Sequence, residues 1–264
     1  NFYSDQSEIS KANKKILASN VEMSDAQKSM WLSKRPVEEL YDTSLDPEEV
    51  NNLASDPNYN DVLLELRSVN RAMVYKTRDS GLATEAYMYE VSERSTPYET
   101  LKDESIFPLN QILSWLDELY FGKPGVEKIL EHLNHKHPLI SYWTMIGLQY
   151  NQQLDPRYIE SLQTLANQPL SMVSLTASET LGKFGHLQAI DKVVEGLSSE
   201  NPYLLLMSAR AFELIENKSP EAMDQGKQAW LRLKKQTEGK WKGYDLYAFW
   251  SLSQVYGNDG NSDS

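Results

Sequence analysis

Three histidines close together in the sequence are the side chains with the clearest potential for chemistry. With one neighbouring carboxylate they form a group within seven residues: Glu131, His132, His135 and His137. Imidazole and carboxylate groups are common zinc ligands, but a zinc site needs three or four well-placed ligands, and two of these spacings suit a loop better than one helical face. Histidines at the end of a helix also complement its dipole. We favour this structural role and predict no metal site.

A second cluster, near the C-terminus, combines aromatic and basic side chains. Its members are Trp230, Arg232, Lys234, Lys235, Lys240, Trp241, Lys242 and Tyr244. Aromatic faces stack on sugar rings, and Lys or Arg can pair with sulfate groups. The candidate glycan contacts are therefore Trp230, Arg232, Lys240 and Trp241. The alternative, which we favour, is a break between two helices with solvated lysines and core tryptophans, because charge runs are usually solvated faces.

No other group of residues forms a catalytic set. Tyr87, Tyr89 and Tyr98 could line a groove, although aromatic side chains serve cores and interfaces more often. The acidic runs at 46–49 and 103–104 suit helix caps and surface, because calcium needs several oxygen ligands at closer spacing. The chain has four His and no Cys, so neither a Ser-His-Asp arrangement nor thiolate chemistry is indicated. We predict no catalytic or cofactor-binding residue in this chain.

The composition is that of an ordinary globular protein, with 264 residues, 40% hydrophobic and 24% charged. Such a length allows one large or two small domains. The net charge of −12 argues against nucleic acid as a partner, because phosphate binding needs clustered Lys and Arg. No apolar run approaches 18 residues, so we predict no membrane span.

The elements that position these residues are mostly helical. Val62, Leu66, Val69 and Met73 recur at intervals of four, three and four, which predicts a helix over 59–77 with one apolar face. Residues 79–104 contain Thr96-Pro97 and few periodic apolar positions, so we expect a linker there with a little helix.

From about residue 106 the chain is repetitive. Three prolines, 31 and 33 residues apart, follow the polar breaks between apolar helical segments: Pro138, Pro169 and Pro202. The pattern predicts helix pairs over 125–151, 158–185 and 189–217, with a fourth, longer pair over 221–256. This is typical of stacked repeats, closest to HEAT-type repeats, in which each pair buries its apolar face against its neighbours.

Corresponding positions in the second helices support this repeat. Leu148, Leu181 and Leu214 fall 33 residues apart, which predicts equivalent places in successive pairs. Small residues predict close approaches between helices at three further positions: Gly147, Ala177 and Ala209.

Residues 38–54 show a different pattern. Residues 39–42, Glu-Leu-Tyr-Asp, alternate polar and apolar side chains as a half-buried strand does. Asp46 is then a suitable N-cap, Pro47 suits the first helical position, and Glu49 could close a capping box. We expect a short strand and a capped helical turn. An unpaired strand would be an exposed edge, so we expect it to be paired or lost.

This segment resembles the C-terminal subdomain of type I sulfatases. Those enzymes carry a similar run of Glu-Leu-Tyr-Asp, a short gap, Asp-Pro, and then Glu, Asn and Leu-Ala. The resemblance extends to residues 31–36, just before the strand. Residues 79–88, residues 96–99 and the helical repeats that follow are similar to a bacterial subgroup.

The resemblance implies a catalytic domain that this chain does not contain. Sulfatases use a formylglycine nucleophile, made from a Cys-X-Pro-Ser-Arg-type motif, and calcium bound by carboxylates. This chain has no Cys and no Ser-X-Pro-X-Arg run to replace it. We therefore interpret it as the accessory C-terminal part of an enzyme that hydrolyses sulfate esters, on a carbohydrate. The partners would be the missing N-terminal sulfatase domain and, through the whole enzyme, a sulfated carbohydrate, in the periplasm or outside the cell.

We predict a mainly α chain with a remnant of the sulfatase C-terminal subdomain and a linker over 1–104. An α-α superhelix of HEAT-like repeats would cover 105–257, followed by a disordered tail over 258–264. The alternative function is a stand-alone helical-repeat scaffold that binds a protein partner along its concave face. Residues 31–60 favour the sulfatase hypothesis, because a scaffold does not need their strand-and-cap pattern.

Overall fold

A computed structural model describes residues 36–151, 153–240 and 242–257, together with six single positions between 16 and 28. Three predictions fall outside these residues: the disordered tail over 258–264, the contact role of Trp241, and the part of the sulfatase-like sequence over 31–35.

The described residues are all-α and contain no strand. The α-helices are α4 (Asn60–Thr77), α5 (Glu85–Val91), α6 (Pro97–Thr100), α7 (Leu109–Asp117), α8 (Val126–Leu133), α9 (Pro138–Gln149), α10 (Ile159–Ala166), α11 (Met172–Lys183), α12 (Ile190–Gly196), α13 (Pro202–Leu214), α14 (Pro220–Thr237) and α15 (Tyr244–Tyr256). The 3₁₀ turns are η1 (Pro57–Tyr59), η2 (Ser80–Leu82), η4 (Pro156–Tyr158) and η5 (Leu187–Ala189), and η3 (Glu118–Gly122) is a π turn.

The chain forms two compact units, Asn1–Met73 and Val74–Ser264. In the first unit the strand expected at 39–42 is absent, so that prediction is wrong. The backbone groups of Leu40 bond to a loop instead: its N–H donates to Asn52 Oδ1 at 2.9 Å, and its carbonyl accepts from the Leu53 N–H at 2.7 Å. The Asn52 amide also donates to the Glu38 carbonyl at 3.0 Å. The Asn52 side chain and the Leu53 backbone thus satisfy the backbone groups of Leu40 without a neighbouring strand.

The capped helical turn expected at 46–49 is also wrong in detail. Asp46 accepts backbone N–H groups, but from Val50 and Asn51 at 2.9 and 2.7 Å, and residues 46–49 form turns without a helix. Glu49 has a left-handed backbone with φ of 53°, which no helical position allows. The result is a closed loop over 38–54, to which Arg67 is joined by two bonds of 2.5 Å to the Glu38 carboxylate.

The helix predicted over 59–77 is confirmed as α4, but its predicted apolar face is exposed. Val62, Leu66, Val69 and Met73 are 46% to 58% exposed to solvent. The half-buried positions of the helix are Leu63, Arg67, Arg71 and Val74. The apolar period of the sequence thus predicted the helix correctly. It did not predict which face of the helix is half-buried against the other described residues.

In the second unit, side-chain caps start many helices. Thr84, Thr96, Ser171, Asn201 and Ser219 each accept a backbone N–H of the helix that follows them. Pro138, Pro202 and Pro220 are first helical residues, where the missing N–H costs nothing. At the predicted breaks, Pro138 and Pro202 therefore begin helices, whereas Pro169 precedes Ser171, which caps α11.

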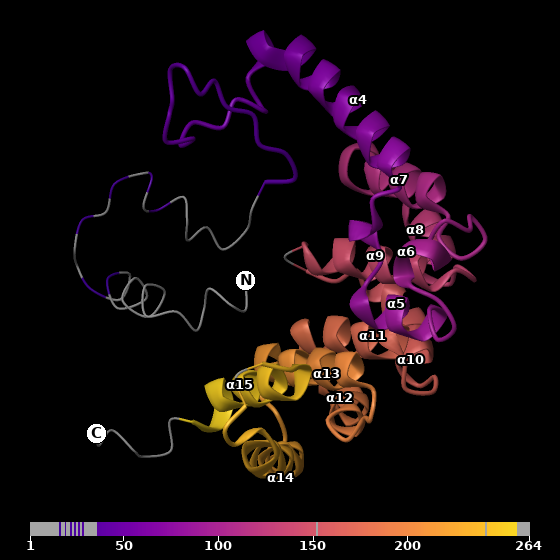
Figure 1. Cartoon of the computed structure of the whole chain (residues 1–264), viewed down its shortest axis with the longest axis vertical. Helices are drawn as coiled ribbons and strands as arrows, with labels where there is room; N and C mark the ends of the chain where they lie inside the picture. Colours follow the sequence, from indigo (N-terminus) through magenta and orange to yellow (C-terminus); the bar gives the residue numbers. More distant parts are fainter. Residues whose placement is uncertain are drawn as a thin grey trace. The chain divides into compact units, whose positions relative to one another are not determined.

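The four predicted helix pairs are found, as α8 with α9, α10 with α11, α12 with α13, and α14 with α15. Figure 1 shows the pairs following one another through the unit. The second helices α9, α11, α13 and α15 each contact the next. The expected close approach is confirmed at Gly147, where an added Cβ would lie 2.4 Å from Leu119. Ala177 and Ala209 are fully buried, and the close approach expected at these two positions stays a prediction.

The predicted equivalence of Leu214 with Leu148 and Leu181 in successive repeats is wrong. Leu148 and Leu181 are buried, whereas Leu214 is 57% exposed. Since α13 ends at Leu214, the chain turns there, and the next residue, Ile215, takes the buried place.

Residues 79–104, expected to be a linker with a little helix, contain the short helices α5 and α6 and pack against other parts of the unit. Ala83, Ala86, Tyr87 and Leu101 belong to the same hydrophobic cluster as residues of α7 and α9. The Trp143 indole on α9 donates to the Leu82 carbonyl at 2.9 Å, and Arg78 donates to the Leu101 carbonyl at 2.8 Å. Helix α5 is thereby held against the helix pairs, which places its exposed face for the site described next.

Candidate binding site

The three clustered histidines have separate structural roles. His132 stacks on Trp115 with ring centroids 3.6 Å apart. His135 Nδ1 accepts the backbone N–H of His137 at 3.0 Å, and His137 Nε2 lies 3.0 Å from the Ile106 carbonyl. Burial lowers the pKa of His135 and of His137, so both favour the neutral form. Among the described residues, no group of three or more His, Cys, Asp or Glu could hold a metal ion.

The candidate glycan contacts are engaged within the fold. Trp230 donates its indole N–H to Ser253 Oγ at 2.9 Å, and its ring centroid lies 6.3 Å from that of Phe249 and 5.3 Å from the Lys234 ammonium. The Arg232 guanidinium donates to the Leu197 carbonyl, and Lys240 pairs with Asp245. A role of these side chains in sugar binding stays a prediction.

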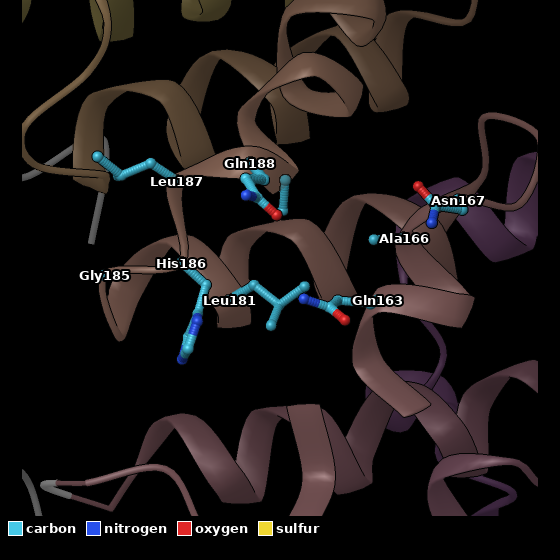
Figure 2. A pocket seen from close by; sticks show the side chains of 9 residues that line it. Gln163, Ala166, Asn167, Leu181, Gly185, His186, Leu187 and Gln188 are labelled. Carbon is cyan, nitrogen blue, oxygen red and sulfur yellow. The ribbon is translucent and has the colours of Figure 1, made fainter. Parts of the chain in front are cut away.

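One hollow of the second unit lies between α10, α11 and the turn at Gly185, with a volume of about 440 Å³ (Figure 2). In Figure 2 the side chains of Leu181 and Gln163 point toward one another. The polar groups of the lining are the amides of Gln163, Asn167 and Gln188 and the His186 imidazole. None of the lining residues is a carboxylate or a nucleophile that could work with His186, so the hollow has no pair for acid–base catalysis.

The three tyrosines considered together in the sequence separate in the structure. Tyr87 is buried and donates to the Ile106 carbonyl at 2.5 Å, and burial raises its pKa. Tyr98 is exposed, with the Lys102 ammonium 4.1 Å from its ring centre. Tyr89 lines a groove.

That groove, here called the tyrosine groove, lies between α5, the start of α6 and the start of α13. Its volume is about 500 Å³, and it is lined by Glu85, Met88, Tyr89, Ser92, Glu93, Pro97 and Tyr203. Tyr89 is 51% exposed, and its ring centroid lies 5.2 Å from that of Tyr203. The other neighbour of Tyr203 is Tyr244 on α15, with centroids 4.4 Å apart. Three helices thus bring together a row of aromatic rings.

Hydrogen bonding orients one carboxylate of the groove. The Tyr244 hydroxyl donates to Glu85 Oε1 at 2.8 Å. Burial, together with this hydrogen bond, raises the pKa of Tyr244, so the phenol keeps its proton and remains a donor. Ser92 Oγ is buried and has no hydrogen-bond partner among the described residues. The lining contains carboxylates, aromatic faces, a thioether and a hydroxyl without a partner among the described residues, and such groups can bind a ligand.

No family model, curated protein or solved structure matches the chain. No helix in the described part of the chain is both long and apolar enough to cross a membrane.

The sequence interpretation missed most of the tyrosine groove. It named Tyr89 but not Glu85, Glu93 or Tyr203, and it placed Tyr244 in the basic cluster. A local signal could have drawn attention to Tyr203, which follows Asn201-Pro202 on the first turn of a helix. Its proximity to Tyr89 depends on the packing of α13 against α5, and no local sequence pattern reports that packing.

Proposed function

We propose that this chain is the C-terminal part of a formylglycine-dependent sulfatase and has no catalytic role by itself. The whole enzyme would hydrolyse sulfate esters, on a carbohydrate. The formylglycine and the calcium ion would belong to a separate catalytic domain. The residues of this chain do not fit either group, because the sequence has no Cys and the described residues contain no candidate metal cluster.

The sulfatase-like residues have structural roles that are consistent with this proposal. Asn52 closes the loop over 38–54 onto the backbone of Glu38 and Leu40, and Asp46 holds the turn at Val50 and Asn51. These polar side chains hold the loop together by hydrogen bonds. This structural role explains the distinctive sequence of the segment without a catalytic role for it.

The observation that carries the proposal is the exposed apolar face of α4. Val62, Leu66, Val69 and Met73 form one stripe directly after the sulfatase-like loop, and each is about half exposed. Exposed apolar stripes of this kind mark interaction surfaces. We propose that the catalytic domain covers this stripe in the whole enzyme.

The helix pairs α8 to α15 would then support that assembly. We propose that they stack into an α-α superhelix of HEAT-like repeats. The contacts from each second helix to the next, α9 to α11 to α13 to α15, support this arrangement. In the whole enzyme the repeats would buttress the catalytic domain or shape the rim of its cleft.

Charge substitution on the α4 stripe tests the proposal. In the isolated chain, Val69→Asp should leave the Tm unchanged, because the side chain is exposed. In a longer protein that includes the upstream catalytic domain, the same change should lower the Tm and weaken the contact between the parts, because it buries a charge. Asn70→Asp is the matched control, since it adds the same charge at the next exposed position. Equal behaviour of the two variants in the longer protein would contradict the proposal.

Two simpler measurements accompany this test. The coding sequence upstream of residue 1 should contain a Cys-X-Pro-Ser-Arg or Ser-type motif. The purified chain should not cleave an aryl sulfate, with or without calcium. A rate that a point mutation in this chain abolishes would contradict the non-catalytic assignment.

A stand-alone scaffold that binds a protein partner is the second candidate. The tyrosine groove favours it, because the half-exposed ring of Tyr89 beside Tyr203 forms an aromatic surface suited to a partner. An upstream formylglycine motif would count against this alternative.

A further inference from the structure

The tyrosine groove has a strongly biased lining. Two of its seven lining residues, Glu85 and Glu93, are carboxylates, and none is Lys or Arg. Arg94 follows Glu93 in the chain but does not line the groove. The whole chain also carries a net charge of −12, which attracts cationic partners and repels anionic ones.

The aromatic rings add a second attraction for cations. Tyr89 and Tyr203 are tilted by 50° to one another with centroids 5.2 Å apart, and Tyr203 is in turn held by Tyr244 at 4.4 Å. A cation over the face of a tyrosine ring is attracted by its quadrupole. Because Tyr89 is 51% exposed, part of its ring is accessible from solvent.

The combination of carboxylates and aromatic faces suits a planar cation with several N–H donors. Glu85 is oriented by the Tyr244 hydroxyl, and Ser92 supplies a further hydroxyl with no partner among the described residues. A guanidinium group is planar, stacks on aromatic faces and presents five N–H donors in a fork that matches carboxylates. An ammonium group offers a point charge without this planar stacking.

We propose that the tyrosine groove binds an arginine side chain on a basic segment of a partner protein. The guanidinium would stack on Tyr89 and Tyr203 and pair with Glu85 and Glu93, while Met88 and Pro97 contact its methylene groups. The same carboxylates would repel sulfate groups, so this groove is separate from recognition of a sulfated carbohydrate. The proposal does not depend on a sulfatase origin of the chain.

Peptide titration of the full chain tests the proposal. An acetylated and amidated Gly-Arg-Gly peptide is compared with the same peptide carrying citrulline, which keeps the shape but removes the charge. Calorimetry or amide chemical shifts should report saturable binding of the arginine peptide. The citrulline peptide should bind at least about tenfold more weakly, because cation–π and ion-pair contacts are lost together. Raising the salt concentration should also weaken binding of the arginine peptide.

Variants of the groove test the contribution of a carboxylate charge and that of an aromatic ring to binding, each against a control that preserves the fold. Glu93→Gln and Tyr89→Leu should each weaken binding by about threefold to fivefold, and Tyr89→Phe, which keeps the ring, should not. Glu90→Gln removes the same charge from an exposed position outside the lining, so it is the matched control. Equal binding of the two peptides would overturn the proposal. So would loss of binding in Glu90→Gln equal to that in Glu93→Gln, or binding of a neutral oligosaccharide without any response to the arginine peptide.

Discussion

The Tyr244 hydroxyl on α15 donates a hydrogen bond of 2.8 Å to Glu85 Oε1 at the first residue of α5. The two residues are 159 positions apart in the sequence. This bond joins the last helix pair to α5, which precedes the repeats. Helix α13 contacts both through Tyr203, whose ring centroid lies 4.4 Å from that of Tyr244 and 5.2 Å from that of Tyr89. The hydrogen bond also fixes the direction of one carboxylate in the tyrosine groove.

Replacing Tyr244 by Phe tests the importance of this bond. The ring contact with Tyr203 would remain, but Glu85 would lose its donor. We expect the free energy of unfolding to fall by about 0.5–1 kcal/mol and the Tm by roughly 1–4 °C, as for one partly exposed hydrogen bond. Thermal unfolding measures the change. Tyr89→Phe, which removes an exposed hydroxyl from the same row of rings, is the control, and an equal loss in both variants would contradict the prediction.

The loop over 38–54 should depend on one side chain. Asn52 Oδ1 accepts the N–H groups of Leu40 and Ala54 at 2.9 and 3.0 Å, so Asn52→Ala leaves both amides without this acceptor. We expect hydrogen exchange of these two amides to accelerate about fivefold to tenfold, since one such bond contributes about 1 kcal/mol. Asn51→Ala, at the neighbouring exposed position, should leave their exchange unchanged. If Asn52→Ala does not change the exchange either, the loop is closed by other contacts.

Close packing of the last helix pair predicts a large effect at Gly226. A Cβ there would lie 2.4 Å from Phe212 Cζ and 2.5 Å from the Tyr256 hydroxyl. Phe212 is fully buried, so it has little room to move. Gly226→Ala should therefore destabilise the chain by about 1–3 kcal/mol in urea unfolding. At Gly125, the N-cap residue of α8, the nearest atom to an added Cβ is at 3.6 Å, so Gly125→Ala should cost less, about 0.5–1 kcal/mol for the poorer cap.

The helix pairs could be predicted from the sequence because their signals are local. Pro138 and Pro202 begin helices through their fixed backbone, and the small residues Gly147, Ala177 and Ala209 lie at tight or fully buried positions. A proline acts at its own position, and apolar residues three or four positions apart share one helical face, so both signals can be recognised within a short stretch of sequence. The repeat spacing alone was less informative at Leu214, where the end of α13 changes which residue is buried.

The loop and the groove could not be predicted, for a different reason. A four-residue alternation at 39–42 does not distinguish a strand from an extended loop, and the competing acceptor, Asn52, lies 12 residues beyond Leu40. The groove requires Tyr89, Tyr203 and Tyr244 to meet through packing of α5, α13 and α15. Neither arrangement has a periodic pattern in the sequence.

Two partly buried histidines, His135 and His137, predict a loss of stability in mild acid. Burial lowers the pKa of His135 and His137 from the ordinary value of 6.5, so below pH 6.5 the unfolded chain binds protons that the folded chain does not. The free energy of unfolding therefore falls as the pH drops below 6.5, by at most about 1.4 kcal/mol per pH unit for each histidine.

Two local contacts explain why the folded chain resists these protons, and one substitution tests the prediction. His137 Nδ1 is buried with no partner among the described residues, and His135 Nδ1 must be unprotonated to accept the His137 N–H. Urea unfolding between pH 7.5 and 5.5 measures the slope, and His137→Asn should reduce it. Asp155, whose pKa its hydrogen bonds to Arg157 lower to about 2, does not titrate in this range. An unchanged slope in His137→Asn would show that other groups cause the acid sensitivity.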